Sequence, residues 1–243
     1  MTVIKLNATA STNDYLRVLC NTQRVENYTT VTAEIQTQGK GQRGNKWTTE
    51  PHKNLTFSIL IQDVLPENAS VFDLNIAVST ALISALESFK IPKISIKWPN
   101  DILADGKKIA GILIENSISG NHKVLSIVGV GVNVNQTDFG NLPRASSLKN
   151  STQTTFDKDE ILYQIIDEIK KNGELIRLGK ADVLWKKYHE YLFRKGIPSV
   201  FENPDGTKFM GIIKQVLKNG KLQLLLEDDS LKEFELKEIG LVY

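Results

Sequence analysis

Residues 36–47 combine the residue types that would close around a small anion. They read QTQGKGQRGNKW, with three glycines, a lysine and an arginine inside six positions. Glycine lets the backbone approach a ligand closely and turn its N–H groups toward a negative charge. Lys40, Arg43 and Lys46 add positive charge, and Trp47 adds a flat apolar wall. A surface turn with solvated charges would have the same composition, so this segment alone leaves both interpretations open.

The same glycines match the dinucleotide-binding pattern G-x-G-x-x-G, from Gly39 to Gly44. That pattern binds a pyrophosphate only where a helix begins at the glycines and presents its first N–H groups. Here residues 45–51 read NKWTTEP, which offers no apolar helical face and ends in a proline. The element that follows has the composition of a strand. We therefore do not expect a nicotinamide-cofactor site.

A second group of polar residues lies near the middle of the chain. Residues 97–101 read KWPND and residues 107–115 read KKIAGILIE. Pro99 fixes its own φ and restricts Trp98, so the first run should end a strand with a rigid turn. Lys108 enters a strand that is otherwise apolar until Glu115. Such a lysine has either an anionic partner or an exposed place at the end of a hairpin, and the sequence leaves both open.

Composition limits the classes of protein to which the chain can belong. Its 243 residues, 41% hydrophobic and 24% charged, predict a globular protein with a sizeable core. The net charge of +2 gives no reason to expect a nucleic-acid partner. Cys20 is the only cysteine, so no internal disulfide can form, which is typical of a reducing compartment. We find no apolar run of the roughly 18 residues that span a bilayer and no signal-peptide pattern, and so expect a cytoplasmic protein with no membrane partner.

The elements expected to position these residues alternate between strands and helices. Capping patterns mark helix starts at Ser11 and Asp157, and the first helix should bury an apolar face that includes Tyr15. Apolar positions at helical spacing, beginning with Val71, predict a helix over residues 70–89. Another helix should cover about 181–192. Predicted strands cover residues 3–6, 29–36, 54–61, 94–97, 109–115 and 124–134, with turns at 105–106 and 119–121.

The pattern changes after Lys195. Short strands are predicted at residues 199–202, 208–217, 221–227 and 231–236, separated by tight-turn residues. Such a run of short strands suggests a small barrel. With fewer than about 50 residues it should depend on the larger domain for stability. We therefore expect a catalytic domain over residues 1–195 and a small β-barrel domain over residues 196–243.

Taken in order, the motifs resemble those of the biotin–protein ligases. The matching runs are STND at 11–14, Q-x-x-G-x-G-x-R-G-x-x-W at 36–47, KWPND at 97–101, KKIAGIL at 107–113 and GVGVNVN at 129–135. The likeness covers roughly residues 1–195. It implies an α+β fold: a mixed β-sheet catalytic domain of the class II synthetase-like, biotin/lipoate ligase type, followed by a small SH3-like β-barrel. It points to the single-function biotin–[acetyl-CoA-carboxylase] ligases, which lack an N-terminal DNA-binding domain.

The resemblance implies a two-step reaction. The carboxylate of biotin attacks the α-phosphate of MgATP, which gives biotinyl-5′-adenylate and pyrophosphate. A lysine of a biotin carboxyl carrier domain then attacks this mixed anhydride, and AMP leaves. The first step brings a carboxylate against a polyanion, so cations must be in place beforehand. We expect Lys108 between the carboxylate and the α-phosphate, Arg43 as a forked donor to phosphate, and the glycine-rich loop ordered over the adenylate.

These expectations define sets of site residues. The catalytic residues are Lys108 and Arg43. The residues assigned to biotin are Ser11, Thr12, Asn13, Gln36, Lys40, Gly41, Gln42, Lys108 and Gly111. The residues assigned to ATP and the adenylate are Gly39, Lys40, Arg43, Trp47, Lys97, Asn100 and Lys108, with Mg²⁺ entering with ATP near Asp101. Structural roles are also open for Ser11 and Asn13 as helix caps, Trp47 as core, Lys97 as an ion-pair partner, and Asn100 and Asp101 as parts of a turn.

A lipoate–protein ligase or octanoyltransferase is the nearest alternative enzyme, with a related fold and a similar lysine. The glycine-rich basic loop together with KWPND argues against it. A transcription regulator has little support, because the motifs begin at Ser11. His52, His122 and His189 lie far apart in the sequence without a cysteine partner, so neither a zinc site nor a histidine-based triad is indicated. The sequence leaves monomer or homodimer, and the identity of the acceptor protein, open.

Gln42 stands where many biotin–protein ligases have an arginine, which should loosen the hold on the anionic intermediate unless Lys40 and Lys46 compensate. Gln42→Arg is therefore expected to lengthen the half-life of the bound adenylate, since a guanidinium forms charged hydrogen bonds to phosphate. The half-life is measured as release of labelled adenylate from the preformed complex. An unchanged half-life would contradict this assignment of Gln42.

Overall fold

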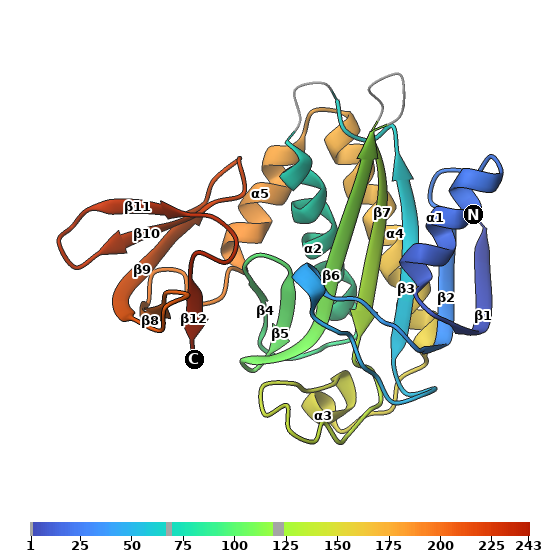
Figure 1. Cartoon of the computed structure of the whole chain (residues 1–243), viewed down its shortest axis with the longest axis horizontal. Coiled ribbons are helices and arrows are strands. Elements are labelled where there is room, and N and C mark those ends of the chain that lie inside the picture. Colours follow the sequence, from blue (N-terminus) through green and yellow to red (C-terminus); the bar gives the residue numbers. More distant parts are fainter. Residues whose placement is uncertain (1, 67–69, 119–123) are drawn as a thin grey trace.

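A computed structural model describes residues 2–66, 70–118 and 124–243. Within these ranges the strands form a seven-stranded sheet and a five-stranded sheet (Figure 1). The large sheet has the order β1 (Val3–Thr9), β2 (Thr30–Gln36), β3 (Leu55–Gln62), β7 (Val124–Val132), β6 (Lys107–Ile118), β5 (Asp101–Ala104) and β4 (Ile94–Lys97). β1 and β2 are parallel, and the other neighbouring strands of this sheet are antiparallel. This mixed sheet with helices confirms the predicted α+β class.

Three helices cover one face of the large sheet: α2 (Val71–Ser88), α4 (Lys158–Arg177) and α5 (Ala181–Glu190) (Figure 1). A capping box begins α2, because Ser70 Oγ accepts from the Phe72 N–H and the Asp73 carboxylate accepts from the Ser70 N–H. By length and composition α2 could cross a membrane, yet 72% of it is buried inside the protein. The expectation that no apolar stretch reaches this length was wrong, and the stretch is the helix at the centre of the core.

The opposite face of the sheet carries α1 (Thr12–Thr22) and a second, smaller core. Side chains alternate along a strand, so Leu60 faces α1 while Ile59 faces the main core. The smaller core consists of Leu16, Val31, Leu60 and Ile127. Tyr15 and Val71 were expected in apolar faces but are 37% and 50% exposed. Each lies in the first turn of its helix, on the side that faces solvent.

The β5–β6 hairpin places Lys108 next to a strand that the sequence did not reveal. β5 pairs antiparallel with both β4 and β6. Its predicted turn is confirmed, since Asp105 and Gly106 have φ of 49° and 75°, the left-handed pair that suits a two-residue hairpin. A register shift between Ile102 and Leu103 adjusts the pairing of β5 with β6. The turn predicted at residues 119–121 lies outside the described residues.

The five-stranded sheet has the order β11 (Leu231–Phe234), β10 (Leu222–Leu226), β9 (Lys208–Val216), β8 (Pro198–Glu202) and β12 (Gly240–Val242). Four of its strands were predicted and β12 was not. Its apolar residues join the main core, and Trp98 Nε1 donates to the Gly220 carbonyl at 2.9 Å. The division into domains after residue 195 stays a prediction.

His189 on α5 connects the two sheets. Its Nε2 lies 3.0 Å from both the N and the O of Val216 in β9. Burial is the main cause that lowers the pKa of His189, and the cations Lys195 and Lys218 lower it further, against opposing backbone hydrogen bonds. A folded pKa below the unfolded value of about 6.5 means that the unfolded chain binds more protons. The stability from neutral His189 is therefore complete above about pH 6.5 and is lost as the pH falls through that value.

Replacing His189 is expected to reduce the loss of thermal stability as the pH becomes acidic. In the unaltered protein the melting temperature should fall between about pH 7.5 and about pH 5.5, and the fall should be smaller in His189→Gln because the proton uptake is gone. Thermal unfolding across this range measures it. His52→Gln is the control, since His52 is exposed and pairs with Glu34. Equal slopes in the unaltered protein and His189→Gln would show that His189 does not couple pH to stability.

Candidate active site

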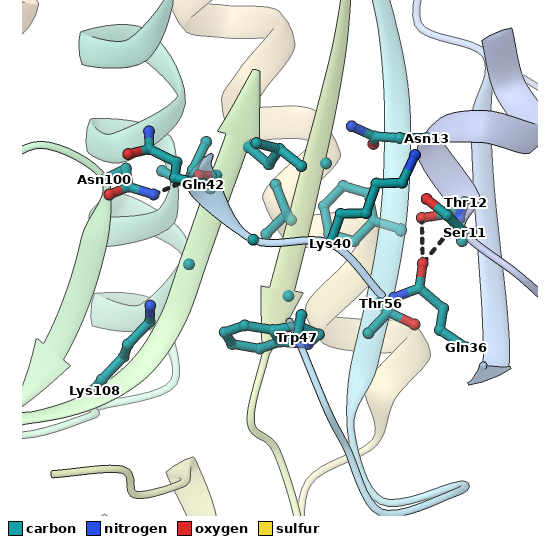
Figure 2. A pocket seen from close by; sticks show the side chains of 18 residues that line it. Ser11, Thr12, Asn13, Gln36, Lys40, Gln42, Trp47, Thr56, Asn100 and Lys108 are labelled. Atoms are coloured by element: carbon teal, nitrogen blue, oxygen red, sulfur yellow. Dashed lines mark hydrogen bonds between the residues drawn. The ribbon is translucent and has the colours of Figure 1, made fainter. Parts of the chain in front are cut away.

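A pocket opens on the face of the large sheet opposite α2, beside the first turn of α1 (Figure 2). In the ligand-free protein it encloses about 50 Å³. Its walls come from the start of α1, the glycine-rich loop, and strands β3, β6 and β7. The lining residues are Ser11, Thr12, Asn13, Gln36, Lys40, Gly41, Gln42, Trp47, Thr56, Phe57, Asn100, Lys108, Gly111, Ile112, Leu113, Gly129, Val130 and Gly131.

The polar end of the pocket is built at the N-terminus of α1. Gln36 Oε1 accepts from the Thr12 N–H (2.8 Å) and from Thr12 Oγ1 (3.1 Å). Ser58 Oγ lies 2.7 Å from Thr12 Oγ1 and 2.5 Å from Asn13 Oδ1. Asn13 Nδ2 donates to Glu115 Oε2 (2.7 Å). The network satisfies a free N–H of the first helical turn and holds uncharged donors and acceptors in fixed positions.

Glycines form the floor of the pocket. Gly111 on β6 and Gly131 on β7 are register partners. A Cβ on Gly131 would lie 2.6 Å from Trp47 Nε1, and one on Gly111 would lie 3.2 Å from the same ring. A Cβ on Gly129 would lie 2.5 Å from Asn13 Oδ1. The missing side chains therefore let the Trp47 indole and the Asn13 amide lie directly on the sheet backbone.

The cationic end of the pocket is Lys108. Its Nζ lies 2.6 Å from Asp101 Oδ1, with side chains 33% and 18% exposed, and 5.5 Å from the centroid of the Trp47 ring. Its backbone is fixed on both sides, because Lys108 N donates to the Arg144 carbonyl (2.7 Å) and Ser146 N donates to the Lys108 carbonyl (2.9 Å). Of the two alternatives for Lys108, the structure therefore has the lysine with an anionic partner.

The glycine-rich loop is a narrow hairpin that reaches across the pocket. Gly41 N donates to the Asn45 carbonyl (2.7 Å), and Trp47 N donates to the Gly39 carbonyl (2.9 Å). Between them lies a single 3₁₀ turn, η1 (Gln42–Gly44), so the glycines begin no α-helix. Gly39 is tightly enclosed, since an added Cβ would lie 3.2 Å from Gln36 Nε2 and closer still to the Trp47 carbonyl.

Lys97 lies in a second cavity, between the two sheets, and Gln42 lines both this cavity and the first pocket. Burial is the main cause that lowers the pKa of Lys97. The Asp101 carboxylate opposes this shift, and the nearby cations Lys108 and Arg144 add to it. A buried lysine with too little negative charge around it is a favourable contact for an incoming anion.

Residues 6–133 match the model of the biotin/lipoate A/B protein ligase family, and this match spans more than half of the chain. The chain belongs to that family. Among solved structures, the biotin protein ligase from Aquifex aeolicus in complex with biotin and ATP has a TM-score of 0.82 at 27% sequence identity. That superposition covers 99% of this chain and 98% of the Aquifex chain.

Curated relatives of this ligase-family chain include the bifunctional ligase/repressor BirA of Bacillus subtilis, 29% identical over 161 residues. A biotin–[acetyl-CoA-carboxylase] ligase of Mycobacterium tuberculosis is 28% identical over 197 residues. The two alignments cover 65% and 79% of this chain. The chain spans about half of the Bacillus protein, 49%, and 71% of the mycobacterial one.

The ligase-family pocket collects most of the predicted site residues. Those that line it are Ser11, Thr12, Asn13, Gln36, Lys40, Gly41, Gln42, Trp47, Asn100, Lys108 and Gly111. Gly39 and Lys97 line adjoining cavities, and Asp101 reaches the pocket through its ion pair with Lys108. The Arg43 side chain lies outside the described part of the structure.

Some structural roles left open by the sequence are also present. Ser11 caps α1, with its Oγ accepting from the Asp14 N–H at 3.5 Å. Asn100 joins β5 to β6, because its Nδ2 donates to the Ile112 carbonyl at 2.7 Å. Sequence reasoning missed Gly129 and Gly131 as site residues although their motif was recognised. Their role depends on which face of the sheet they occupy, and strand register decides that.

Histidines contribute nothing to this site in the described residues. His52 pairs with Glu34, His189 bonds to Val216, and His122 lies outside the described residues. In the ranges that the structure describes, no three His, Cys, Asp or Glu side chains gather in a way that could hold a metal ion.

A methyl group on the pocket floor is expected to displace the Trp47 indole. Gly131→Ala places a Cβ 2.6 Å from Trp47 Nε1, so the ring must move toward solvent. Trp47 emission, taken as the difference between each protein and its Trp47→Phe version, should shift to longer wavelength. Gly240→Ala is the control, because its Cβ would meet nothing nearer than the Glu202 carbonyl at 3.9 Å. Unshifted emission in Gly131→Ala would show that this glycine does not make the space for the indole.

Proposed function

We propose that the chain is a biotin–protein ligase, which activates biotin with MgATP and transfers it to a lysine of a biotin carboxyl carrier domain. The observation that carries the proposal is the polarity of the pocket. Figure 2 places Lys108 on one side of Trp47 and the hydrogen-bonding group of Ser11, Thr12 and Gln36 on the other, where the Lys40 ammonium is neutralised by Asp14 outside the pocket. A ligand with a neutral hydrogen-bonding ring at one end and a carboxylate at the other fits this order, as biotin does.

In the first step a carboxylate oxygen of biotin forms a bond to the α-phosphorus of ATP, and the bond to pyrophosphate breaks. Lys108 lies where negative charge accumulates, and its backbone is fixed before any ligand arrives. The Asp101 carboxylate balances Lys108 in the free protein and is exchanged for ligand oxygens on binding. Supporting contacts to the phosphates would come from the loop residues Gly39, Lys40 and Arg43 and from Lys97.

Asp101 suits a Mg²⁺ ion that arrives with ATP. Magnesium keeps several waters and is commonly held by one or two carboxylates together with substrate phosphates. In the free protein Asp101 Oδ1 pairs with Lys108 Nζ. The carboxylate becomes available to the ion when Lys108 turns to the substrate. When bound, the ion would neutralise charge on the phosphates and on the leaving pyrophosphate.

In the second step the amine of the acceptor lysine attacks the carbonyl of the mixed anhydride, loses a proton, and releases AMP. The acceptor would approach from the open side of the pocket. We further propose a cytoplasmic protein with a catalytic domain over residues 1–195 and a small β-domain after it, acting as monomer or homodimer. No nucleic acid or membrane takes part in this reaction.

Lipoate and octanoate are the competing acids, because ligases for lipoate belong to the same family. Their distal ends offer no donor or acceptor to the Thr12–Gln36–Asn13 group. An apolar chain end would form no hydrogen bond with that group, whereas the ureido ring of biotin can both donate and accept. The pocket therefore favours biotin.

Lys108→Ala is expected to lower biotin-dependent ATP–pyrophosphate exchange by about 10²–10³-fold, because a preorganised charge at the reacting atoms is removed. Lys107→Ala is the matched control, a neighbouring lysine of the same hairpin that is exposed. Lipoate and octanoate are assayed alongside. Exchange with lipoate alone would replace the biotin assignment, and no exchange with any acid would refute adenylation.

A further inference from the structure

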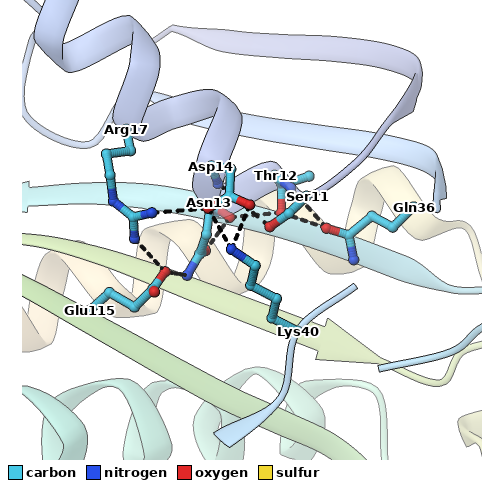
Figure 3. Close-up of polar contacts among 9 residues, drawn as sticks. Ser11, Thr12, Asn13, Asp14, Arg17, Gln36, Lys40 and Glu115 are labelled. Atoms are coloured by element: carbon cyan, nitrogen blue, oxygen red, sulfur yellow. Dashed lines mark hydrogen bonds and ion pairs between the residues drawn. The ribbon is translucent and has the colours of Figure 1, made fainter. Parts of the chain in front are cut away.

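Asp14 lies just outside the pocket and forms an ion pair with Lys40 of the glycine-rich loop. In the described part of the structure, no other side chain of this loop forms an ion pair. Lys40 Nζ lies 2.6 Å from Asp14 Oδ2 and 2.7 Å from Asp14 Oδ1, so both carboxylate oxygens contact the ammonium (Figure 3). Asp14 is not among the residues that line the pocket, whereas Lys40 is. Asp14 therefore acts on the site through other residues, and Lys40 is the one that connects it to the loop.

Asp14 is itself fixed by a chain of contacts that ends on the sheet. Arg17 Nη1 lies 2.9 Å from Asp14 Oδ1, and Arg17 Nη2 lies 2.7 Å from Glu115 Oε2 on β6. The same Glu115 oxygen accepts from Asn13 Nδ2, which orients the Asn13 amide in the pocket. Figure 3 shows these side chains side by side, from α1, the loop and β6. The position of the loop and the polar end of the pocket therefore share one network.

The Asp14–Lys40 ion pair can stabilise the closed position of the loop and can still break to let the loop open. The two side chains are 36% and 45% exposed, so solvent and salt screen their attraction. Exposed pairs of this kind shift an equilibrium by up to about fivefold. The loop they hold is rich in glycine, and its other contacts are Trp47 on the glycine floor and, at its start, the Gln38 N–H that donates to the Ala10 carbonyl at 2.8 Å.

We propose that Asp14 is a positioning residue whose ion pair with Lys40 is a salt-sensitive clasp that keeps the glycine-rich loop closed over the pocket. Closure retains the ligand and excludes water, and opening admits substrates and the acceptor lysine. The effect on a bound adenylate rests on the proposed ligase function. The clasp itself belongs to the ligand-free protein and can be tested without any substrate.

Hydrogen exchange of the backbone amides in residues 38–47 of the ligand-free protein tests the clasp directly. Asp14→Asn should speed this exchange by up to about fivefold, and Asp14→Glu should retain most of the protection. Raising the salt from about 0.05 M to about 0.5 M should speed exchange in the unaltered protein and leave Asp14→Asn unaffected. Asp159→Asn is the matched control, an exposed ion pair with Lys5 elsewhere on the surface. Loop exchange equal to that of the unaltered protein in Asp14→Asn would overturn the proposal.

Because Asp14 is also in the first turn of α1, its loss could loosen the helix instead of the loop. Lys40→Met removes the other half of the pair and leaves α1 unchanged. Faster loop exchange in both variants supports the clasp, whereas faster exchange in Asp14→Asn alone overturns it.

A separate measurement connects the clasp to catalysis. If the proposed function holds, Asp14→Asn should shorten the half-life of bound biotinyl-adenylate several-fold and raise KM for biotin more than it lowers kcat. An unchanged half-life together with faster loop exchange would overturn the role of the clasp in retention. If exchange changes as expected but neither protein forms an adenylate, the ligase function fails and the clasp stands.

Discussion

The pocket depends on the absence of side chains at adjacent positions of the large sheet. Gly111 and Gly131 face each other across β6 and β7, and Gly129 lies two residues away. Trp47 and Asn13 occupy the space that Cβ atoms would take. The indole then becomes both the wall of the pocket and the contact that fixes one end of the loop. A sheet with ordinary side chains here would be flat and filled, and the loop would have nothing to close upon.

Charge in the site is arranged in exchangeable pairs. Lys108 is held by Asp101 and Lys40 by Asp14, so each cation has a carboxylate partner before ligand binds. Such pairs keep the lysines in place without burying unpaired charge. At Lys108 an anionic ligand can then take the place of the Asp101 carboxylate, whereas the Lys40–Asp14 pair stays formed while the loop is closed. Lys97 differs, because burial lowers its pKa and its surroundings contain more positive than negative charge.

The five-stranded sheet contributes to the surroundings of the site through aromatic contacts. Tyr243 lies 5.1 Å from Lys97 Nζ and 4.7 Å from the Arg144 guanidinium, measured to the ring centroid. Trp98, which follows β4 of the large sheet, donates its Nε1–H to the Gly220 carbonyl in the part of the chain that forms the five-stranded sheet. The cavity that contains Lys97 is thus formed by both sheets, and its shape depends on how firmly they pack. Neutral His189, bonded to Val216, is part of that packing.

The sequence by itself determined the family-specific motifs, the helix that Ser11 caps, most strands, and Lys108 as the cation to examine. These depend on local signals: capping residues, alternation of apolar side chains, and turn residues such as Gly106. It did not reveal β5 or β12, whose runs DILA and GLV do not alternate between polar and apolar residues.

The tertiary structure alone decided which side chains meet. The Asp14–Lys40 pair joins residues 26 positions apart, and the Gly111–Gly131 floor depends on antiparallel register. The packing of the two sheets also places Lys97 in a second cavity, apart from the pocket that contains Lys108. Each of these follows from the pairing and packing of distant segments, a property that residue types along a chain do not carry.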